Sequence, residues 1–150
     1  MNVGHVCQHK VVTTSPTEDL ATAARLMREK HIGYLVVVEP GAQEGFVPVG
    51  VLTDRDIVVS VVAADADPRA LCVGDVMTRK PVTVLLEDTV PDALQEMRRI
   101  GVRRLPVVGP FGNLHGILSL DDILIRMAGD LDGAAGAIRK ERAVESTSRP

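Results

Sequence analysis

Aromatic residues are scarce in this chain of 150 residues: they make up 2% of the sequence, and tryptophan is absent. The hydrophobic core must therefore consist of aliphatic side chains. The scarcity also argues against the aromatic stacking platforms that bind single-stranded nucleic acid. A net charge of -3 gives no overall attraction to polyanions. We therefore do not expect nucleic acid as a partner.

Cysteine and long apolar segments are lacking as well. Cys7 and Cys72 are too few for a disulfide framework, and no apolar stretch approaches the length that spans a bilayer. We expect a soluble cytoplasmic protein with reduced thiols and no membrane partner. No GxSxG or Walker A motif occurs, and His31 and His115 have no nucleophile in a recognisable setting. A binding protein is therefore expected, not an enzyme.

Internal repetition organises what the sequence does contain. A shift of 70 residues aligns 3–6 with 73–76, and a shift of 66 residues aligns 50–57 with 116–123. The shift changes because the first copy has four extra residues within 39–48, a stretch with glycine and proline that favours a hairpin loop. The chain is therefore predicted to contain two copies of one unit.

Each copy follows the same order of elements, because short β-branched runs favour strands and apolar residues at helical spacing favour helices. In the first copy Ser15, Pro16 and Glu18 fit the start of a helix. The predicted strands are 11–14, 34–38, 47–52, 82–85, 104–108 and 114–118. The predicted helices begin at Ser15 and end before Gly33, and cover 54 to about 62, 89–100 and 120 to about 128.

These elements give an α/β (α+β) fold class and set the boundaries of the units. Residues 3–64 form the first β-α-β-β-α repeat, 65–72 a surface linker and 73–128 the second repeat. Residues 129–150 form a tail that we expect to be frayed or disordered. One unit alone leaves a face of its sheet uncovered. We therefore expect the repeats to pack sheet to sheet as a pseudo-twofold module, with a cleft where the sheets meet.

Both repeats carry a hydroxyl residue followed three positions later by an aspartate, Thr53 with Asp56 and Ser119 with Asp122. One interpretation is a helix cap that serves stability alone. The other is a ligand site, because a helix N-terminus attracts anions and an aspartate accepts hydrogen bonds from ribose hydroxyls. Capping boxes favour Glu or Gln at the third position, and both pairs lie where a buried strand meets a helix. We favour ligand binding, with which capping is compatible.

Residues 98–104 form the densest basic cluster of this acidic chain. Arg98 and Arg99 suit the C-terminus of a helix, which needs no ligand to explain it. Arg103 and Arg104 begin a strand that is otherwise buried, and from there an arginine would point along the cleft towards the strand–helix turns. We therefore favour contact with a phosphate for Arg103 or Arg104.

Two further patterns concern metal and redox chemistry. His5, Cys7 and His9 alternate in a way that invites a metal interpretation. The equivalent positions 75, 77 and 79 hold Asp, Met and Arg, and no fourth ligand is nearby, so we expect no metal site. Cys7 and Cys72 leave a thiol redox switch open as an alternative, although no CxxC motif is present to activate them.

The doubled pattern resembles the CBS domain family (named for cystathionine beta-synthase), in the form of a stand-alone pair, or Bateman module. The resemblance rests on segments 50–57 and 116–123, on Gly101-Val-Arg-Arg-Leu-Pro-Val-Val108 and on Val73-Gly-Asp-Val-Met-Thr78. It covers residues 3–128 and implies two pseudo-symmetric clefts that bind adenosine-containing ligands. AMP is the first candidate, and ADP, ATP, NAD and S-adenosylmethionine are the others.

Carried onto this chain, the resemblance implies two sets of binding residues, in which aspartate holds the ribose and arginines contact phosphate. The first set is Val51, Thr53, Asp56, Met77, Val82, Val102 and Arg103. The second set is Ile117, Ser119, Asp122, Cys7, Val12, Gly33 and Tyr34, and Arg103 and Arg104 supply the phosphate contacts. Because the first copy has Gly33 and Tyr34 where the second has two arginines, the two clefts are expected to differ in affinity or preferred ligand.

The resemblance also implies a homodimer in which the helices of two modules pair, and the apolar segment 57–62 is consistent with such an interface. We therefore expect a homodimeric, regulatory adenine-nucleotide sensor that signals to an unidentified protein by a population shift. Two alternatives remain open. One is a structural interaction module in which the Thr/Ser–Asp pairs are only caps, and the other is the thiol redox switch.

Overall fold

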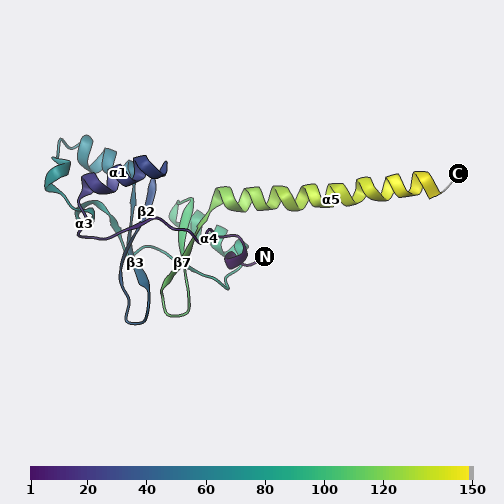
Figure 1. Ribbon diagram of the computed structural model, residues 1–150, viewed down its shortest axis with the longest axis horizontal. Coiled ribbons are helices and arrows are strands. Elements are labelled where there is room, and N and C mark those ends of the chain that lie inside the picture. The colour runs from purple at the N-terminus through teal and green to yellow at the C-terminus, as the bar shows by residue number, and fades with distance from the viewer. Residues whose placement is uncertain (149–150) are drawn as a thin grey trace.

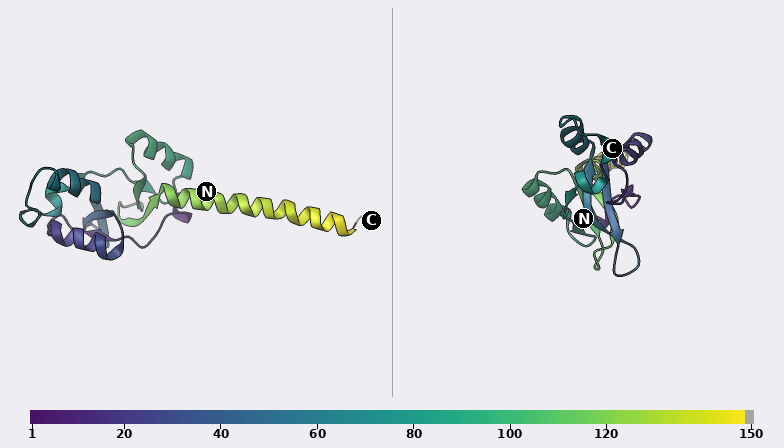
Figure 2. Two further views of the ribbon diagram at one scale, coloured as in Figure 1. Left: turned by 90° about the horizontal axis from the view of Figure 1, so that it is seen from above. Right: turned by 90° about the vertical axis from the view of Figure 1, so that its left-hand side faces the viewer.

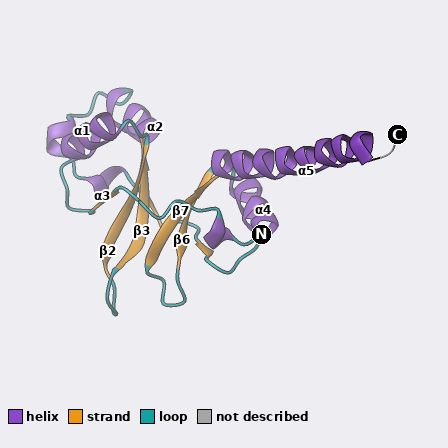
Figure 3. Ribbon diagram, turned by 45° about the vertical axis from the view of Figure 1, so that its right-hand side comes forward, coloured by secondary structure: helices purple, strands orange, loops and turns teal. Residues whose placement is uncertain are grey.

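Two small β-sheets form the centre of the molecule in the computed structural model, which describes residues 1–148 (Figure 1). The first sheet has the order β1-β2-β3-β4 and the second β5-β6-β7. The strands are β1 (Thr13–Thr14), β2 (Tyr34–Pro40), β3 (Phe46–Thr53), β4 (Thr78–Arg79), β5 (Val84–Leu85), β6 (Arg104–Val108) and β7 (Leu114–Ser119). The sheets meet along β3 and β7, which lie side by side in Figure 3.

Helices flank both sheets. The α-helices are α1 (Leu20–Lys30), α2 (Asp54–Ile57), α3 (Val73–Val76), α4 (Val90–Ile100) and α5 (Leu120–Ser148), with short 3-10 helices at Val3–His5 and Pro68–Ala70. A π-helix, Val58–Val62, continues α2, so that residues 54–62 form one helical segment as predicted. Within residues 1–148, no helix combines the length and the apolar character that crossing a membrane requires.

The two repeats share their strand pairing. In each repeat the first strand pairs in parallel with the next, which then pairs in antiparallel with the third. Tyr34 lies opposite Thr53 in the first hairpin, and Arg104 lies opposite Ser119 in the second. Both hairpins also have a register irregularity at equivalent positions, after Val37 and after Val107. The predicted pair of β-α-β-β-α repeats is confirmed.

Each repeat completes its core with the segment that precedes the other repeat. Val73 and Met77 are buried in the core of the first repeat, whereas Val3 and Cys7 are buried in the core of the second. Backbone hydrogen bonds fix both exchanges, since the Val73 N–H donates to the Glu18 carbonyl at 2.9 Å and the Val3 N–H donates to the Asp88 carbonyl at 2.8 Å. We call residues 3–9 and 73–79 the lead-in segments. The exchange of lead-in segments ties the repeats together.

Two glycines let the lead-in segments approach the sheets. A Cβ on Gly50 would lie 2.6 Å from Met77 Sδ and 2.9 Å from the Thr78 carbonyl oxygen. A Cβ on Gly116 would lie 2.7 Å from the Gln8 carbonyl oxygen and 3.0 Å from Cys7 Sγ. Contacts this short leave no room for a side chain, so glycine is required at both equivalent positions.

The start of the first helix was predicted wrongly. Helix α1 begins at Leu20 with Asp19 in the capping position, not at Ser15. The carbonyl oxygens of Pro16 and Glu18 accept hydrogen bonds from Gly74 and Val73 of the lead-in segment. Because these oxygens are engaged outside the helix, residues 15–18 do not join α1.

The C-terminal tail also differs from its prediction. Helix α5 was expected to end near residue 128 and to be followed by a frayed tail, but it continues to Ser148 and leaves the body of the molecule (Figures 1 and 2). Residues 129–148 are rich in Ala, Arg, Lys and Glu, which have high helix propensity and outweigh the three glycines. Residues 149 and 150 lie outside the described part of the chain.

The division between buried and exposed leucines gives a test of the fold. Leu118 on β7 is 0% exposed, whereas Leu131 on α5 is 71% exposed. We expect Leu118→Ala to lower the free energy of unfolding by about 2–5 kcal/mol, because it leaves a cavity in the second core. The matched change Leu131→Ala is expected to stay within about 0.5 kcal/mol of the parent. Urea denaturation measures both, and equal losses would contradict the assigned core.

Candidate ligand-binding sites

The first candidate site lies where β3 runs into α2. Thr53 ends the strand, and its side-chain oxygen accepts a hydrogen bond from the Asp56 N–H at 3.1 Å. In return the Thr53 N–H donates to Asp56 Oδ2 at 2.9 Å. This reciprocal capping box fixes both side chains at the half-buried junction. Asp56 Oδ1 has no hydrogen-bond partner among residues 1–148.

The second candidate site lies at the equivalent junction of β7 and α5. The Asp122 N–H donates to Ser119 Oγ at 3.0 Å, and the Ser119 hydroxyl donates to Asp122 Oδ2 at 2.5 Å. The other oxygen, Oδ1, accepts a hydrogen bond at 2.8 Å from the side-chain amide of Gln8. Both carboxylate oxygens of Asp122 therefore have protein partners, unlike those of Asp56.

The lead-in segments bring further predicted residues to these junctions. Val51 pairs with Thr78, so that Met77 lies beside the strand that ends in Thr53. Ile117 pairs with Gln8, and Cys7 lies beside the strand that ends in Ser119. The structure thus groups Met77 with the first junction and Cys7 with the second.

Tyr34 and Arg104 connect the two junctions. They are equivalent residues of the two repeats, and the Arg104 guanidinium carbon lies 5.9 Å from the centre of the Tyr34 ring. Burial raises the pKa of the Tyr34 phenol well above its usual value, and the positive charge of Arg104 opposes this shift without cancelling it. The strand register places Tyr34 next to Thr53 and Arg104 next to Ser119. This cation–π contact therefore lies between the two hydroxyl residues.

Arg103 and Gly33 lie within their own repeats. Arg103 forms an ion pair with Asp121 at 2.8 Å, and its carbonyl oxygen accepts the Leu120 N–H at 2.8 Å. Gly33 makes the equivalent backbone contact with Asp54 at 3.0 Å, and a Cβ there would clash with the Asp54 carboxylate. Arg103 thus lies beside the second junction, where the prediction gave it a phosphate contact, and its additional place in the first set stays a prediction.

Three apolar residues of the predicted sets are placed by contacts inside their own repeats. Val12 packs against the first core, and its carbonyl oxygen accepts the Val36 N–H. Val82 packs against the second core, and Val102 is exposed after α4. Their role in a ligand site stays a prediction.

Sequence reasoning missed two residues that contact the predicted ones. Gln8 is the residue after Cys7, which had been assigned to a pocket wall, and Asp121 directly precedes the motif aspartate Asp122. Their proximity in sequence to predicted residues was a weak signal. Which atoms they would meet depends on long-range pairing, which a single sequence does not show.

Helix capping itself is confirmed at both junctions, and it also occurs where no ligand was predicted. At the start of α4, Thr89 Oγ1 accepts a hydrogen bond from the Asp92 N–H at 3.2 Å. This third hydroxyl–aspartate pair has the same spacing but belongs to no predicted site. A cap alone is therefore no sign of a ligand, and Asp92 offers a control for the two motif aspartates.

Metal and thiol chemistry have little support in the described residues. No group of three or more His, Cys, Asp or Glu side chains within residues 1–148 is arranged to hold a metal ion. Burial raises the pKa of the Cys7 thiol, and the nearby negative charge of Asp122 adds to this shift. A raised pKa lowers the thiolate fraction and hence the reactivity of Cys7.

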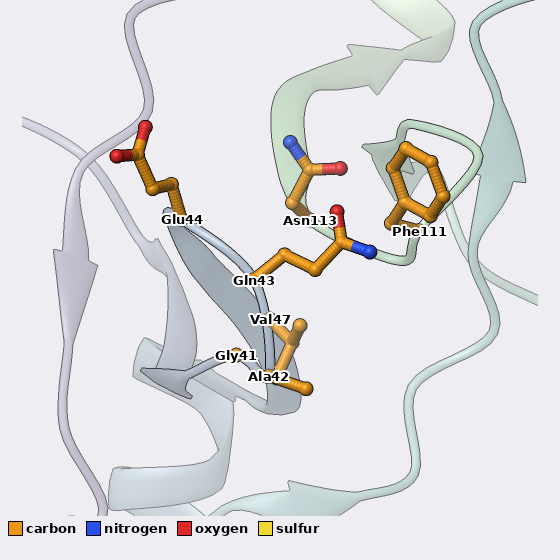
Figure 4. Close-up of a pocket in the computed structure, with 7 residues that line it drawn as sticks. All are labelled: Gly41, Ala42, Gln43, Glu44, Val47, Phe111 and Asn113. Atoms are coloured by element: carbon orange, nitrogen blue, oxygen red, sulfur yellow. The ribbon is translucent and has the colours of Figure 1, made fainter.

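A hollow of about 390 Å³ lies away from both junctions, between the tips of the two hairpins. Gly41, Ala42, Gln43, Glu44 and Val47 line it from the first repeat, and Phe111 and Asn113 line it from the second. Figure 4 shows the Gln43 side chain extended towards Asn113 and Phe111, whereas Glu44 points away from them. None of the predicted site residues lines this hollow.

The buried phenol gives a test of the contact between the repeats. Tyr34 is the one tyrosine of a chain without tryptophan, so its ionisation can be followed by ultraviolet absorbance. We expect the native protein to ionise above the usual pKa of about 10 and the urea-unfolded chain to ionise near it. Since the unfolded chain releases this proton first, stability should fall as the pH rises above about 10. Equal titration of both states would contradict the burial of Tyr34.

Comparison with known proteins shows which family shares this repeated sequence. The CBS domain family matches residues 3–63 and 73–129. An uncharacterized protein of Methanopyrus kandleri is 38% identical over 124 residues, which cover 83% of this chain and 61% of that protein. The CBS domain-containing protein YhcV of Bacillus subtilis is 35% identical over 127 residues, which cover 84% of this chain and 86% of YhcV.

A solved structure shares the fold. It is a CBS domain pair in complex with 5′-methylthioadenosine and S-adenosyl-L-methionine, with a TM-score of 0.73 and 22% identity over 87% of this chain and 98% of that one. At this identity the likeness is one of fold. Together with the family match over both repeats and the two relatives, it leads to one conclusion: the chain belongs to the CBS domain family and contains two CBS domains in tandem.

Proposed function

We propose that this CBS pair is a regulatory module that binds an adenosine-containing ligand at the two strand–helix junctions and signals its bound state to a partner protein. One observation carries the proposal. A hydroxyl–aspartate pair occurs twice at equivalent junctions, and each time it lies beside the lead-in segment of the other repeat. A ligand at either junction would contact both repeats and so couple binding to their relative position.

The chemistry of the junctions suits an adenosine ligand. An ionised aspartate accepts hydrogen bonds from the paired hydroxyls of a ribose, and Asp56 Oδ1 is available for one. The helical segments that start at the junctions favour negative charge at their N-termini, as a phosphate would supply. Val51 and Met77 provide apolar surface for a base. Arg104, which lies between the two junctions, supplies positive charge for a phosphate, and Arg103 can add to it by leaving its ion pair with Asp121.

The positive charge of the arginines near the junctions decides which adenosine ligand to test first. Arg104 near the two helix N-termini favours a phosphate-bearing ligand, so AMP is the first to test, with ADP, ATP and NAD next. S-adenosylmethionine also belongs on the list, because a CBS pair of the same fold binds it together with 5′-methylthioadenosine. The proposed function is binding and regulation, not catalysis, and the regulated protein is left unnamed.

Oligomeric state and location complete the proposal. Val58, Val59 and Val62 are more than half exposed on the helical segment after β3, and Leu124 and Ile125 are exposed at the equivalent place on α5. Such apolar patches favour pairing with a second module, which supports a homodimer through these helices. Both cysteines are free, which fits a reducing compartment such as the cytoplasm.

Substitution of the motif aspartates tests ligand binding. We expect Asp56→Ala and Asp122→Ala each to weaken AMP binding at one site by at least roughly tenfold, because each removes a charged hydrogen-bond acceptor. Isothermal titration calorimetry on the parent and both variants measures the loss.

Asp92→Ala is the matched control, because it removes an aspartate of the same capping pattern at α4. It should cost roughly 0.3–1 kcal/mol of stability, because an acidic side chain in the first turn stabilises the helix N-terminus, and leave AMP binding unchanged. If none of AMP, ADP, ATP, NAD and S-adenosylmethionine binds the parent, the sensor function is wrong. If all three variants lose only stability, the chain is a structural interaction module.

A further inference from the structure

We infer that Gln8 makes the Ser119–Asp122 junction the weaker of the two adenosyl sites, because its side-chain amide occupies the carboxylate oxygen that a ribose would need. This inference rests on the proposed function and adds to it an order of filling. The Thr53–Asp56 junction fills first, because at the second junction the ribose must compete with Gln8 for Asp122 Oδ1.

Gln8 is held in place by its backbone. Its N–H donates to the Ile117 carbonyl at 2.9 Å, and its own carbonyl accepts the Ile117 N–H at 2.9 Å. The absence of a side chain at Gly116 makes this close pairing feasible. A residue fixed by two hydrogen bonds to β7 presents its side chain at a constant distance from the end of that strand. The fixed backbone therefore keeps the Gln8 side chain within reach of Asp122.

The hydrogen bond between Gln8 and Asp122 has only one possible direction. An ionised carboxylate only accepts hydrogen bonds, so the Gln8 amide must present its NH₂ group to Asp122 Oδ1, at 2.8 Å. The Ser119 hydroxyl and Asp122 Oδ2 already bind each other. A ribose hydroxyl can reach Oδ1 in the direction of Gln8 only by displacing the amide.

The first repeat has the same backbone without the same contact. Thr78 is the residue equivalent to Gln8, and it pairs with Val51 as Gln8 pairs with Ile117. No hydrogen bond between Thr78 and Asp56 is found in the described chain, and Asp56 Oδ1 lacks a partner there. The two junctions thus share their framework and differ at this one side chain.

The test isolates the second site. AMP is titrated calorimetrically into the full chain carrying Asp56→Ala, which leaves the second junction as the site that is measured. The titration is repeated after adding Gln8→Ala or Gln8→Thr. Gln8→Thr places at the second junction the residue type that Thr78 provides at the first. We expect either change to tighten AMP binding roughly threefold to tenfold, the net effect of one hydrogen bond. Thr78→Ala in the Asp122→Ala background is the control and should leave affinity at the first site unchanged.

The outcomes separate this inference from the proposed function. Two sites of equal affinity in the parent, or unchanged or weaker AMP binding in both Gln8 variants, overturn the role of Gln8 and leave the adenosyl function standing. Absence of AMP binding in the parent and in Gln8→Ala alike overturns both. Circular dichroism of each variant shows whether it is folded, and the second Gln8 variant serves if the first is not.

Discussion

The backbone pairing of each lead-in segment with the opposite repeat is the constraint on which the rest of the structure depends. Gln8 pairs with Ile117 and Thr78 pairs with Val51, at places where Gly116 and Gly50 leave room for a second chain segment. This pairing carries Val3 and Val73 into cores that are otherwise formed by the other repeat. It also sets the distance between each lead-in segment and the end of the strand beside it.

Duplication supplies two equivalent frameworks, and single side chains make them unequal. Tyr34 and Arg104 occupy the same position in the two repeats and contact each other, so one junction has a phenol beside it and the other a guanidinium. Asp121 occupies the position that Arg55 holds in the first repeat, and it forms an ion pair with Arg103. A repeat therefore predicts where sites lie better than what each site prefers.

The sequence predicted the features that depend on local pattern. Periodicity located β6 at its observed bounds and α4 within one residue of them. Helix α4 has local boundary signals, since a proline lies in its first turn and Gly101 ends it. The Ser15 cap failed because the Pro16 and Glu18 carbonyls bind a segment more than fifty residues away. The contacts of Gln8 with Asp122 and of Arg103 with Asp121 were not predicted for the same reason, since a side-chain contact between distant segments leaves no pattern in either segment alone. The prediction for the tail failed because its glycines and mixed charges indicated a frayed segment, whereas the helix propensity summed over residues 129–148 favours a helix.

The exchange of lead-in segments also determines what would happen if the two repeats were separated into two chains. A single repeat with its own lead-in would carry a segment that fits another copy and would expose the groove that its own core leaves open. Two such copies could complete one another, which is the arrangement of a domain-swapped homodimer. The present chain has the same exchange within one polypeptide, in which residues 63–72 connect the two halves. Its smallest folding unit is therefore the pair.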